Sequence, residues 1–121
     1  MERAFSEILD NIKNELLCKG IRASFVESVA ISTETSLVNT ANFQGFISLS
    51  GDFLFIYKNI LPFGEYSLIQ VLNLKDAALL KFGKHKILRL YYVKLKCQKR
   101  KYEFTGLSEE CMNAIVYSMQ K

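Results

Sequence analysis

Apolar positions recur along the chain with two different periods, and the change of period separates helical from extended segments. In residues 1–19 they recur every three or four positions, which places them on one face of a helix. Gly20 follows Lys19 and ends this predicted helix. The apolar stripe consists of Phe5, Ile8, Leu9, Ile12, Leu16 and Leu17.

From residue 23 the period shortens to two, which is typical of strands with one buried face. The first predicted strand spans residues 23–33. The segment 33–42 is polar and rich in turn-forming residues, so it is predicted as a loop or an irregular hairpin connection. One side of the strand carries Phe25, Glu27, Val29 and Ile31.

A hairpin is predicted next, because two apolar runs in residues 43–59 meet at Ser50-Gly51-Asp52. Glycine there supplies the positive φ that a tight turn needs. Residues 59–65 contain the sole proline and are predicted as a loop. Two further strands are predicted over residues 66–72 and 77–82.

The sixth predicted strand runs from Ile87 to Cys97, after a turn at Gly83-Lys84. Gln98-Lys99-Arg100 then gives a tight connection to a seventh strand over residues 101–105. One side of strand six carries Leu88, Leu90 and Tyr92, and the other carries Ile87, Tyr91, Val93 and Leu95.

A second helix is predicted over residues 108–120. Ser108 is a good N-cap, and Glu109 and Glu110 lie in the first turn, where the helix dipole favours acidic side chains. Its apolar stripe consists of Cys111 or Met112, then Ile115, Val116 and Met119. One helix, seven antiparallel strands and one helix predict an α+β sandwich or small barrel whose open end the last helix closes.

This order resembles the pleckstrin-homology (PH) superfold, and in particular the bacterial PH-like domains, over about residues 26–120. "GFISLSGDFLFIYK" resembles the second and third strands of that group, and "YSLIQVLNLKDAALLKF" its fourth and fifth strands. "KYEFTGLSEECMNAIVYSMQ" resembles its last strand and capping helix. The resemblance implies a seven-stranded antiparallel barrel or sandwich in residues 21–121. The helix of residues 1–20 lies outside the resemblance, and we expect it to pack on that domain.

The resemblance also implies a binding module, because PH-like domains bind phosphoinositides, phosphorylated peptides or other proteins. In the lipid-binding members, basic residues of the first strand pair hold the phosphates. The corresponding segment here, Ser32 to Gln44, contains Glu34 and no Lys or Arg, so the main phosphoinositide signature is absent. The resemblance places the connection between strands six and seven at the same open end as this first loop.

The length of 121 residues fits one compact domain, and an apolar content of 50% supplies a core. Charges interrupt every apolar run before a membrane-spanning length, and the acidic N-terminus lacks the pattern of a secretory signal. The odd count and wide spacing of Cys18, Cys97 and Cys111 favour reduced thiols. We therefore expect a cytoplasmic protein, with a peripheral position at the inner membrane face as the alternative.

The net charge of +4 conceals a strong segregation of charge along the chain. Residues 75–101 carry ten Lys or Arg against Asp76 alone, whereas residues 1–74 have a net charge of −3. Five of these cations gather at the end of strand six and in the turn that follows. These candidate anion-binding residues are Lys94, Lys96, Lys99, Arg100 and Lys101.

Lys94 and Lys96 share the side of strand six that carries Leu90 and Tyr92. We therefore expect a core-facing side that becomes charged near its end, where the strand outruns the barrel and forms a protruding hairpin. In one interpretation the hairpin binds an acidic lipid surface, an acidic protein or a nucleic acid. Nucleic acid is the least favoured, because no recognised binding motif accompanies the charge. In the other, the lysines only protect a sheet edge from aggregation.

The sequence offers little for catalysis. The only histidine, His85, lies among cations in a predicted turn, and no second ligand is spaced for a metal. No phosphate-binding glycine loop or hydrolase motif is present. Burial or simple exposure is the favoured account of the three cysteines. In the alternative, basic neighbours lower the thiol pKa of Cys97, which makes it the nucleophile to test. We expect no enzymatic activity, cofactor, metal or small-molecule substrate.

The predicted function is that of a non-catalytic binding or scaffolding module that takes part in protein–protein interaction or self-association. Peripheral binding to anionic membrane lipid through the basic hairpin is the alternative. The apolar stripe of the N-terminal helix either packs on the barrel or docks on a partner. As a membrane anchor this helix is disfavoured, because its polar face carries Glu2, Glu7, Asp10 and Glu15.

Overall fold

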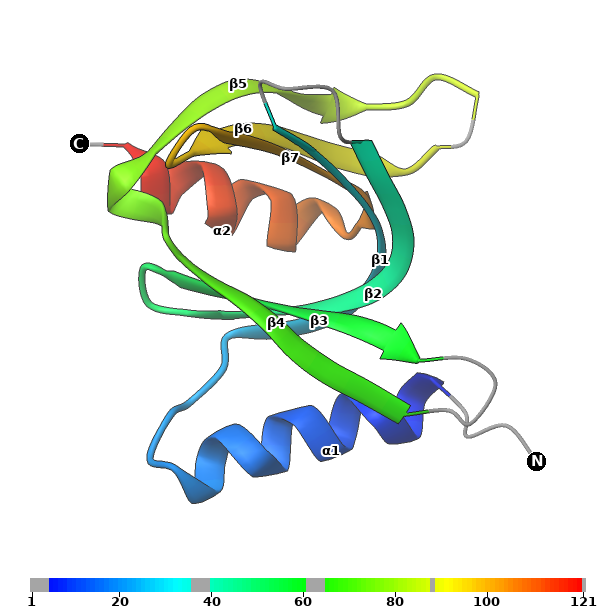
Figure 1. Ribbon diagram of the computed structural model, residues 1–121, viewed down its shortest axis with the longest axis vertical. Coiled ribbons are helices and arrows are strands. Elements are labelled where there is room, and N and C mark those ends of the chain that lie inside the picture. The colour runs from blue at the N-terminus through cyan, green and yellow to red at the C-terminus, as the bar shows by residue number, and fades with distance from the viewer. Residues whose placement is uncertain (1–4, 36–39, 61–64, 88, 121) are drawn as a thin grey trace.

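The computed structural model describes residues 5–35, 40–60, 65–87 and 89–120, with one helix at each end of a run of strands (Figure 1). The helices are α1 (Phe5–Cys18) and α2 (Glu109–Met119), and a short 3-10 turn is η1 (Leu74–Asp76). The strands are β1 (Phe25–Thr35), β2 (Thr40–Ser50), β3 (Phe53–Ile60), β4 (Glu65–Asn73), β5 (Ala77–Lys84), β6 (Tyr91–Cys97) and β7 (Arg100–Leu107). The predicted α+β order of elements is confirmed.

The strands form one antiparallel sheet in the order β4-β3-β2-β1-β7-β6-β5. β1 and β2 are the longest, with 11 residues each, and the second half of β1 pairs with β2 on one side and with β7 on the other. The sheet folds over into two layers, with β3 and β4 in one and β5, β6 and β7 in the other (Figure 1). In this sheet β4 and β5 each have a neighbouring strand on one side only.

Two glycines shape the β2–β3 hairpin. Gly51 lies in the turn with φ +57, as its place between the two apolar runs predicts. Gly45 lies within β2, where an added Cβ would overlap the carbonyl oxygen of Tyr57 on β3 and the side chain of Ile31 on β1. The hairpin therefore excludes a side chain at position 45, because the backbone of β3 passes too close.

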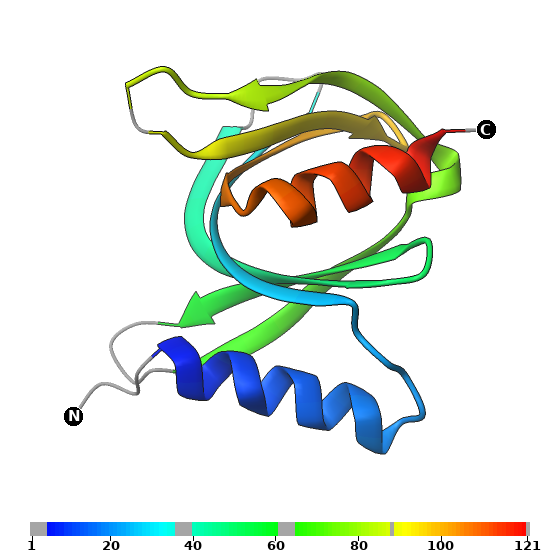
Figure 2. The same ribbon diagram turned by 180° about the vertical axis from the view of Figure 1, so that it is seen from behind.

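The space between the two layers is filled by α2, which both views show lying across the inner side of β5, β6 and β7 (Figures 1 and 2). The predicted apolar stripe of this helix is buried: Cys111, Met112, Ile115, Val116 and Met119. It packs against inward-facing residues of every strand, among them Val29, Ile31, Ile47, Leu54, Leu72, Val93, Leu95 and Phe104. The predicted capping role of the second helix is confirmed.

Glu27 fastens the first turn of α2 to β1. It lies on the side of β1 that also carries the buried Val29, and its carboxylate accepts two hydrogen bonds from Ser108, one from the backbone N–H at 2.9 Å and one from Oγ at 2.6 Å. Ser108 Oγ in turn accepts the N–H of Cys111 at 3.2 Å, so the predicted N-cap is confirmed. A carboxylate is favoured at this position because the N-terminus of a helix carries partial positive charge.

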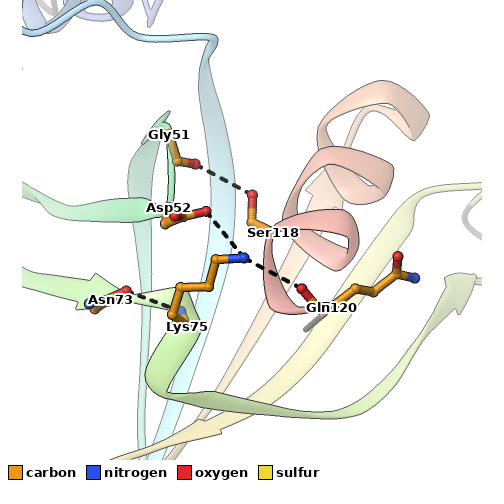
Figure 3. Close-up of polar contacts among 6 residues, drawn as sticks. All are labelled: Gly51, Asp52, Asn73, Lys75, Ser118 and Gln120. Atoms are coloured by element: carbon orange, nitrogen blue, oxygen red, sulfur yellow. Dashed lines mark hydrogen bonds and ion pairs between the residues drawn. The ribbon is translucent and has the colours of Figure 1, made fainter.

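The other end of α2 is fastened where the chain passes from β4 to β5 (Figure 3). Lys75 of η1 forms an ion pair with Asp52 at 3.9 Å and donates a hydrogen bond to the carbonyl of Gln120 at 3.4 Å. Ser118 Oγ donates to the carbonyl of Gly51 at 3.4 Å. The β2–β3 turn, η1 and the end of α2 therefore meet at one corner of the molecule.

Helix α1 covers the outer side of the layer that contains β3 and β4 (Figure 2). Ile8, Ile12 and Leu16 are buried there and pack with Phe46 and Tyr57 in a second apolar cluster. Leu9 is half-buried and Leu17 is 56% exposed, whereas the side chain of Phe5 lies outside the described residues. The division of the chain into units 1–20 and 21–121 stays a prediction.

Two sequence predictions were wrong in their boundaries. The segment 33–42 is not a loop where it is described, because β1 extends to Thr35 and β2 begins at Thr40, while residues 36–39 lie outside the described part. Pairing with strands on both sides stabilises this end of β1 in spite of its polar side chains. The loop predicted over 59–65 was too wide, because β3 extends to Ile60 and β4 begins at Glu65, while residues 61–64 lie outside the described part.

The sixth strand begins at Tyr91 rather than at Ile87. Its pairing partners run out there, because Tyr91 is opposite Lys84 at the end of β5 and Leu107 at the end of β7. Apolar alternation alone cannot show where neighbouring strands end. The predicted strand residue Leu88 lies outside the described residues.

We expect Glu27→Ala to lower the free energy of unfolding by about 1–3 kcal/mol, because it removes both hydrogen-bond acceptors of Ser108 at a part-buried helix terminus. Urea unfolding measures this change. Glu34→Ala on the exposed end of the same strand is the matched control, with an expected change within about 0.5 kcal/mol. Equal losses in both variants would contradict the assigned role of Glu27.

Candidate binding surfaces

The turn between β6 and β7 is tight, as its sequence predicts. Cys97 is paired with Arg100, so Gln98 and Lys99 alone make the connection, with φ values of 51 and 67. Positive φ at both central residues is the geometry of a type I′ hairpin turn, which costs about 1–2 kcal/mol per residue for side chains other than glycine. The turn holds Lys99 at the tip of the hairpin.

The five candidate cations do not form one cluster. Lys94, Lys96 and Lys101 lie on the outer face of the sheet, because they alternate with the buried Val93, Leu95, Cys97 and Tyr102. Arg100 lies on the opposite side, next to the hydroxyl of Tyr102. Burial raises the pKa of that hydroxyl, and Arg100 acts against this rise by its charge and a hydrogen bond.

The predicted protruding hairpin was therefore wrong. The core-facing side of β6 is the side of Val93 and Leu95, and it stays apolar to Cys97, which is 4% exposed. The strand does not outrun the core, and Lys94 and Lys96 are on the outer face throughout. The error follows from the predicted start of β6 at Ile87. Because β6 begins at Tyr91, the side of the strand that faces away from Val93 carries only one apolar residue, Tyr92.

The outer face of β5, β6 and β7 carries four lysines, which we call the basic face: Lys81, Lys94, Lys96 and Lys101. Lys94 is opposite Lys81, and Lys96 is opposite Lys101, so two like-charged pairs face each other across neighbouring strands. Such pairs are destabilising. Glu103 and Glu34 are the cross-strand neighbours of opposite charge, yet Lys75–Asp52 is the only ion pair within 4.0 Å among the described residues.

Sequence reasoning missed the contribution of Lys81. The pairing of β5 with β6 shifts between Leu79 and Lys81, so Leu80 is an extra residue and Lys81 falls opposite Lys94. Without this bulge, alternation from Ala77 would place Lys81 on the inner side. No signal in the sequence marks a bulge of this kind.

The two edge strands differ in chemistry. β5 exposes Leu80 and Phe82, each at 46%, but it also carries Lys81 and Lys84, and cations on an edge discourage pairing with another strand. β4 has no Lys, Arg or Pro, and it exposes three aliphatic side chains, which we call the apolar edge: Leu68 at 47%, Ile69 at 45% and Val71 at 41%. Ile69 is the extra residue of a bulge, where the pairing with β3 shifts.

A groove of about 410 Å³ lies between α1 and this part of β4, lined by apolar residues that include Leu16, Ile21, Phe55 and Leu68. Tyr66 donates a hydrogen bond to Glu15 at 2.5 Å across the groove. Burial, and then the charge of Glu15, raise the pKa of Tyr57 to about 12. The groove therefore combines an apolar floor with the carboxylates of Glu15 and Glu65 and the ammonium group of Lys19.

Comparisons with known proteins find similar folds among solved structures. No family model and no curated protein sequence matches the chain. Among solved structures, the PH domain of ArhGAP27 is similar, with a TM-score of 0.55 and 16% identity over 79% of this chain and 100% of that one. Two structures of Vav1 match with TM-scores of 0.56 and 0.57 and identities of 15% and 16%. Each Vav1 match covers 94% of this chain, which spans only 33% or 32% of the Vav1 chains.

The chain has a PH-like fold. In that fold the β1–β2 and β6–β7 connections were expected at one end, and the register agrees, because Thr35 is opposite Arg100 and Glu34 is opposite Lys101. Glu34 is the one charged side chain among the described residues of 32–44. The described part of the first strand pair of this PH-like fold thus offers no cation to a phosphate group.

The cysteines and His85 are the side chains considered for catalysis or metal binding, and their surroundings differ. Burial, and then Asp76, raise the pKa of Cys97, so the predicted lowering by basic neighbours was wrong. Burial also raises the pKa of Cys111, whereas Cys18 is exposed on α1. The rings of His85 and Tyr92 contact each other with their centroids 4.7 Å apart and their planes tilted by 36°. Among the described residues no group of three His, Cys, Asp or Glu is placed to hold a metal ion, and no helix is long and apolar enough to span a membrane.

We expect Cys18 to react with a disulfide reagent at mildly alkaline pH at least about ten times faster than Cys97 or Cys111, because raised pKa values and burial keep those two thiols neutral and shielded. Mass spectrometry of the labelled native protein identifies the sites, and denaturation should make all three react. Fast labelling of Cys97 in the native state would restore it as a candidate nucleophile.

Proposed function

We propose that the chain is a non-catalytic binding module that engages a partner protein through the apolar edge of β4. The observation that supports this most is the contrast between the two edge strands. Lysines protect β5, whereas β4 presents unpaired backbone groups beside Leu68, Ile69 and Val71. An edge of that composition is an aggregation hazard unless another chain covers it.

The occupant that fits this edge is an extended segment of the partner. Such a segment would add a strand beside β4 and form main-chain hydrogen bonds, while its alternate side chains pack on Leu68 and Val71. Glu15, Glu65 and Lys19 line the neighbouring groove, so its two carboxylates outnumber its one cation, and the segment should carry a basic residue as well as apolar ones. The stripe of α1 is less suited to this role, because Ile8 and Ile12 are already fully buried against the sheet.

We expect Leu68→Lys to weaken partner binding by about tenfold or more, because it places a cation on the one edge that lacks protection. A photo-crosslinking residue at the exposed Ser67 captures the partner in the protein's own cells, and mass spectrometry identifies it. Leu80→Lys on β5 is the matched control and should leave capture unchanged. Equal capture by both variants would contradict the proposal, and a dimer by light scattering would identify a second copy as the occupant.

A second candidate function is peripheral binding to an anionic surface through the predicted cations Lys94, Lys96, Lys99, Arg100 and Lys101, of which Arg100 lies on the other side of the sheet from Lys94, Lys96 and Lys101. The support is that Lys94 and Lys96 face Lys81 and Lys101 across the strands, because a counter-anion would relieve this repulsion. Near an anionic membrane each cation contributes on the order of 1 kcal/mol. The free thiols favour a cytoplasmic location in either case.

Replacing Lys99, Arg100 and Lys101 by Gln should reduce cosedimentation with phosphatidylserine vesicles on the order of a hundredfold at low salt, because three cations are lost. The matched control replaces Lys13, Lys19 and Arg22 by Gln, which removes the same charge from exposed positions in or near α1. Equal losses would indicate that net charge alone attracts the vesicles.

A further inference from the structure

The most exposed apolar residue among the described ones lies in the connection between β5 and β6. Ile87 is 92% exposed, more than any other large apolar side chain in the described chain. It belongs to a short segment that we call the β5–β6 tip, whose described residues are His85, Lys86, Ile87, Arg89 and Leu90. Exposure of this degree means that the described part of the molecule covers very little of this side chain.

The β5–β6 tip is held in shape by its own hydrogen bonds. The N–H of His85 donates to the carbonyl of Leu90 at 2.8 Å, and the N–H of Arg89 donates to the carbonyl of His85 at 3.0 Å. Arg89 has φ +53, and the His85 ring rests on Tyr92. Backbone and ring contacts thus fix both ends of the tip, so the exposure of Ile87 is a feature of a closed turn.

Cations surround the exposed isoleucine. Lys86 and Arg89 are exposed within the tip, and Lys84 precedes it with its ammonium group 5.6 Å from the centre of the Tyr91 ring. Residues 77–102 contain no Asp or Glu. Two acids act on Tyr91, which follows the tip: Glu109, which accepts its hydrogen bond at 3.0 Å, and Glu110. Leu90, at 40%, and Phe82, at 46%, add exposed apolar area beside the same turn.

We propose that the β5–β6 tip enters the interface of an anionic lipid bilayer, with Ile87 among the upper acyl chains and Lys84, Lys86 and Arg89 at the lipid phosphates. Apolar burial combined with cation–phosphate attraction is the pair of signals that gives stable peripheral binding. A protein partner is a poorer match, because a short convex turn offers far less than the roughly 800 Å² per partner of a stable protein interface.

This inference goes beyond the proposed function, because it uses other residues. The tip precedes Tyr91, and the β6–β7 turn follows Cys97, so the two lie at opposite ends of β6. The apolar edge belongs to β4, in the other layer of the sheet (Figure 1). Loss of partner binding at β4, or of anion binding at Lys99, Arg100 and Lys101, would leave membrane entry by the tip intact.

The chain contains no tryptophan, so Ile87→Trp introduces a single tryptophan in the tip, whose emission can be excited selectively over that of the six tyrosines. With vesicles of phosphatidylcholine and phosphatidylserine, we expect its emission to shift to the blue and to be quenched by lipids brominated in their acyl chains. Leu17→Trp, at the 56% exposed position on α1, is the control and should show neither effect. An unchanged emission at position 87, or equal quenching at both positions, would overturn the proposal.

In the otherwise unchanged chain, Ile87→Ser should reduce vesicle binding at least about fivefold and remove the part that persists at high salt. Lys86→Gln should weaken binding chiefly at low salt. If Ile87→Ser binds as the native chain does while the Gln variant at Lys99, Arg100 and Lys101 does not, the β6–β7 turn is the membrane contact and the tip is not. A blue shift with polyglutamate in the absence of lipid would instead indicate an acidic protein partner.

Discussion

The structure depends on the burial of one face of α2 between the two layers of a sheet that never closes. Five apolar side chains of this helix occupy the interior, from Cys111 to Met119. Because α2 fills that space, the strands do not need to meet, and β4 and β5 keep free edges. Glu27 at one end and Lys75 at the other fix the helix in place, so the open geometry that creates the candidate surfaces follows from one packed helix.

Free edges have opposite consequences according to their side chains. On β5 and its neighbours the chain concentrates lysines, which keep the outer face hydrated and at the same time create an electric field attractive to anions. On β4 the same backbone geometry carries aliphatic side chains and a bulge at Ile69. The segregation of charge along the sequence thus becomes a segregation between two layers of the fold.

Much of the fold was predictable because local signals agree with the final structure. Residues close in sequence determine the turn at Gly51, the N-cap at Ser108 and the buried face of α2. The short gap between two alternating runs marks the turn at Gln98-Lys99. The start of β6 and the extension of β1 were missed, because strand ends depend on where the neighbouring strands stop. The partner of Glu27 is Ser108, which is 81 residues away in sequence, and no local pattern connects them.

The candidate surfaces were less predictable than the fold. The five cations were found from composition, but a bulge at Leu80 decides that Lys81 stands beside Lys94. The apolar edge required knowledge of which strand lies at the border of the sheet, and the part of the β5–β6 tip from Ile87 onward was hidden inside a predicted strand.

The placement of α1 has a practical consequence for anyone who trims this chain. Ile8 and Ile12 cover Phe46 of β2 and Tyr57 of β3. A version that begins at residue 21 would expose those two rings to water. Together with the half-buried Val26 and Phe55 they would form one exposed apolar patch. Such a fragment would associate non-specifically through this patch, whatever its natural partners are. Binding studies on this module therefore need helix α1 in place.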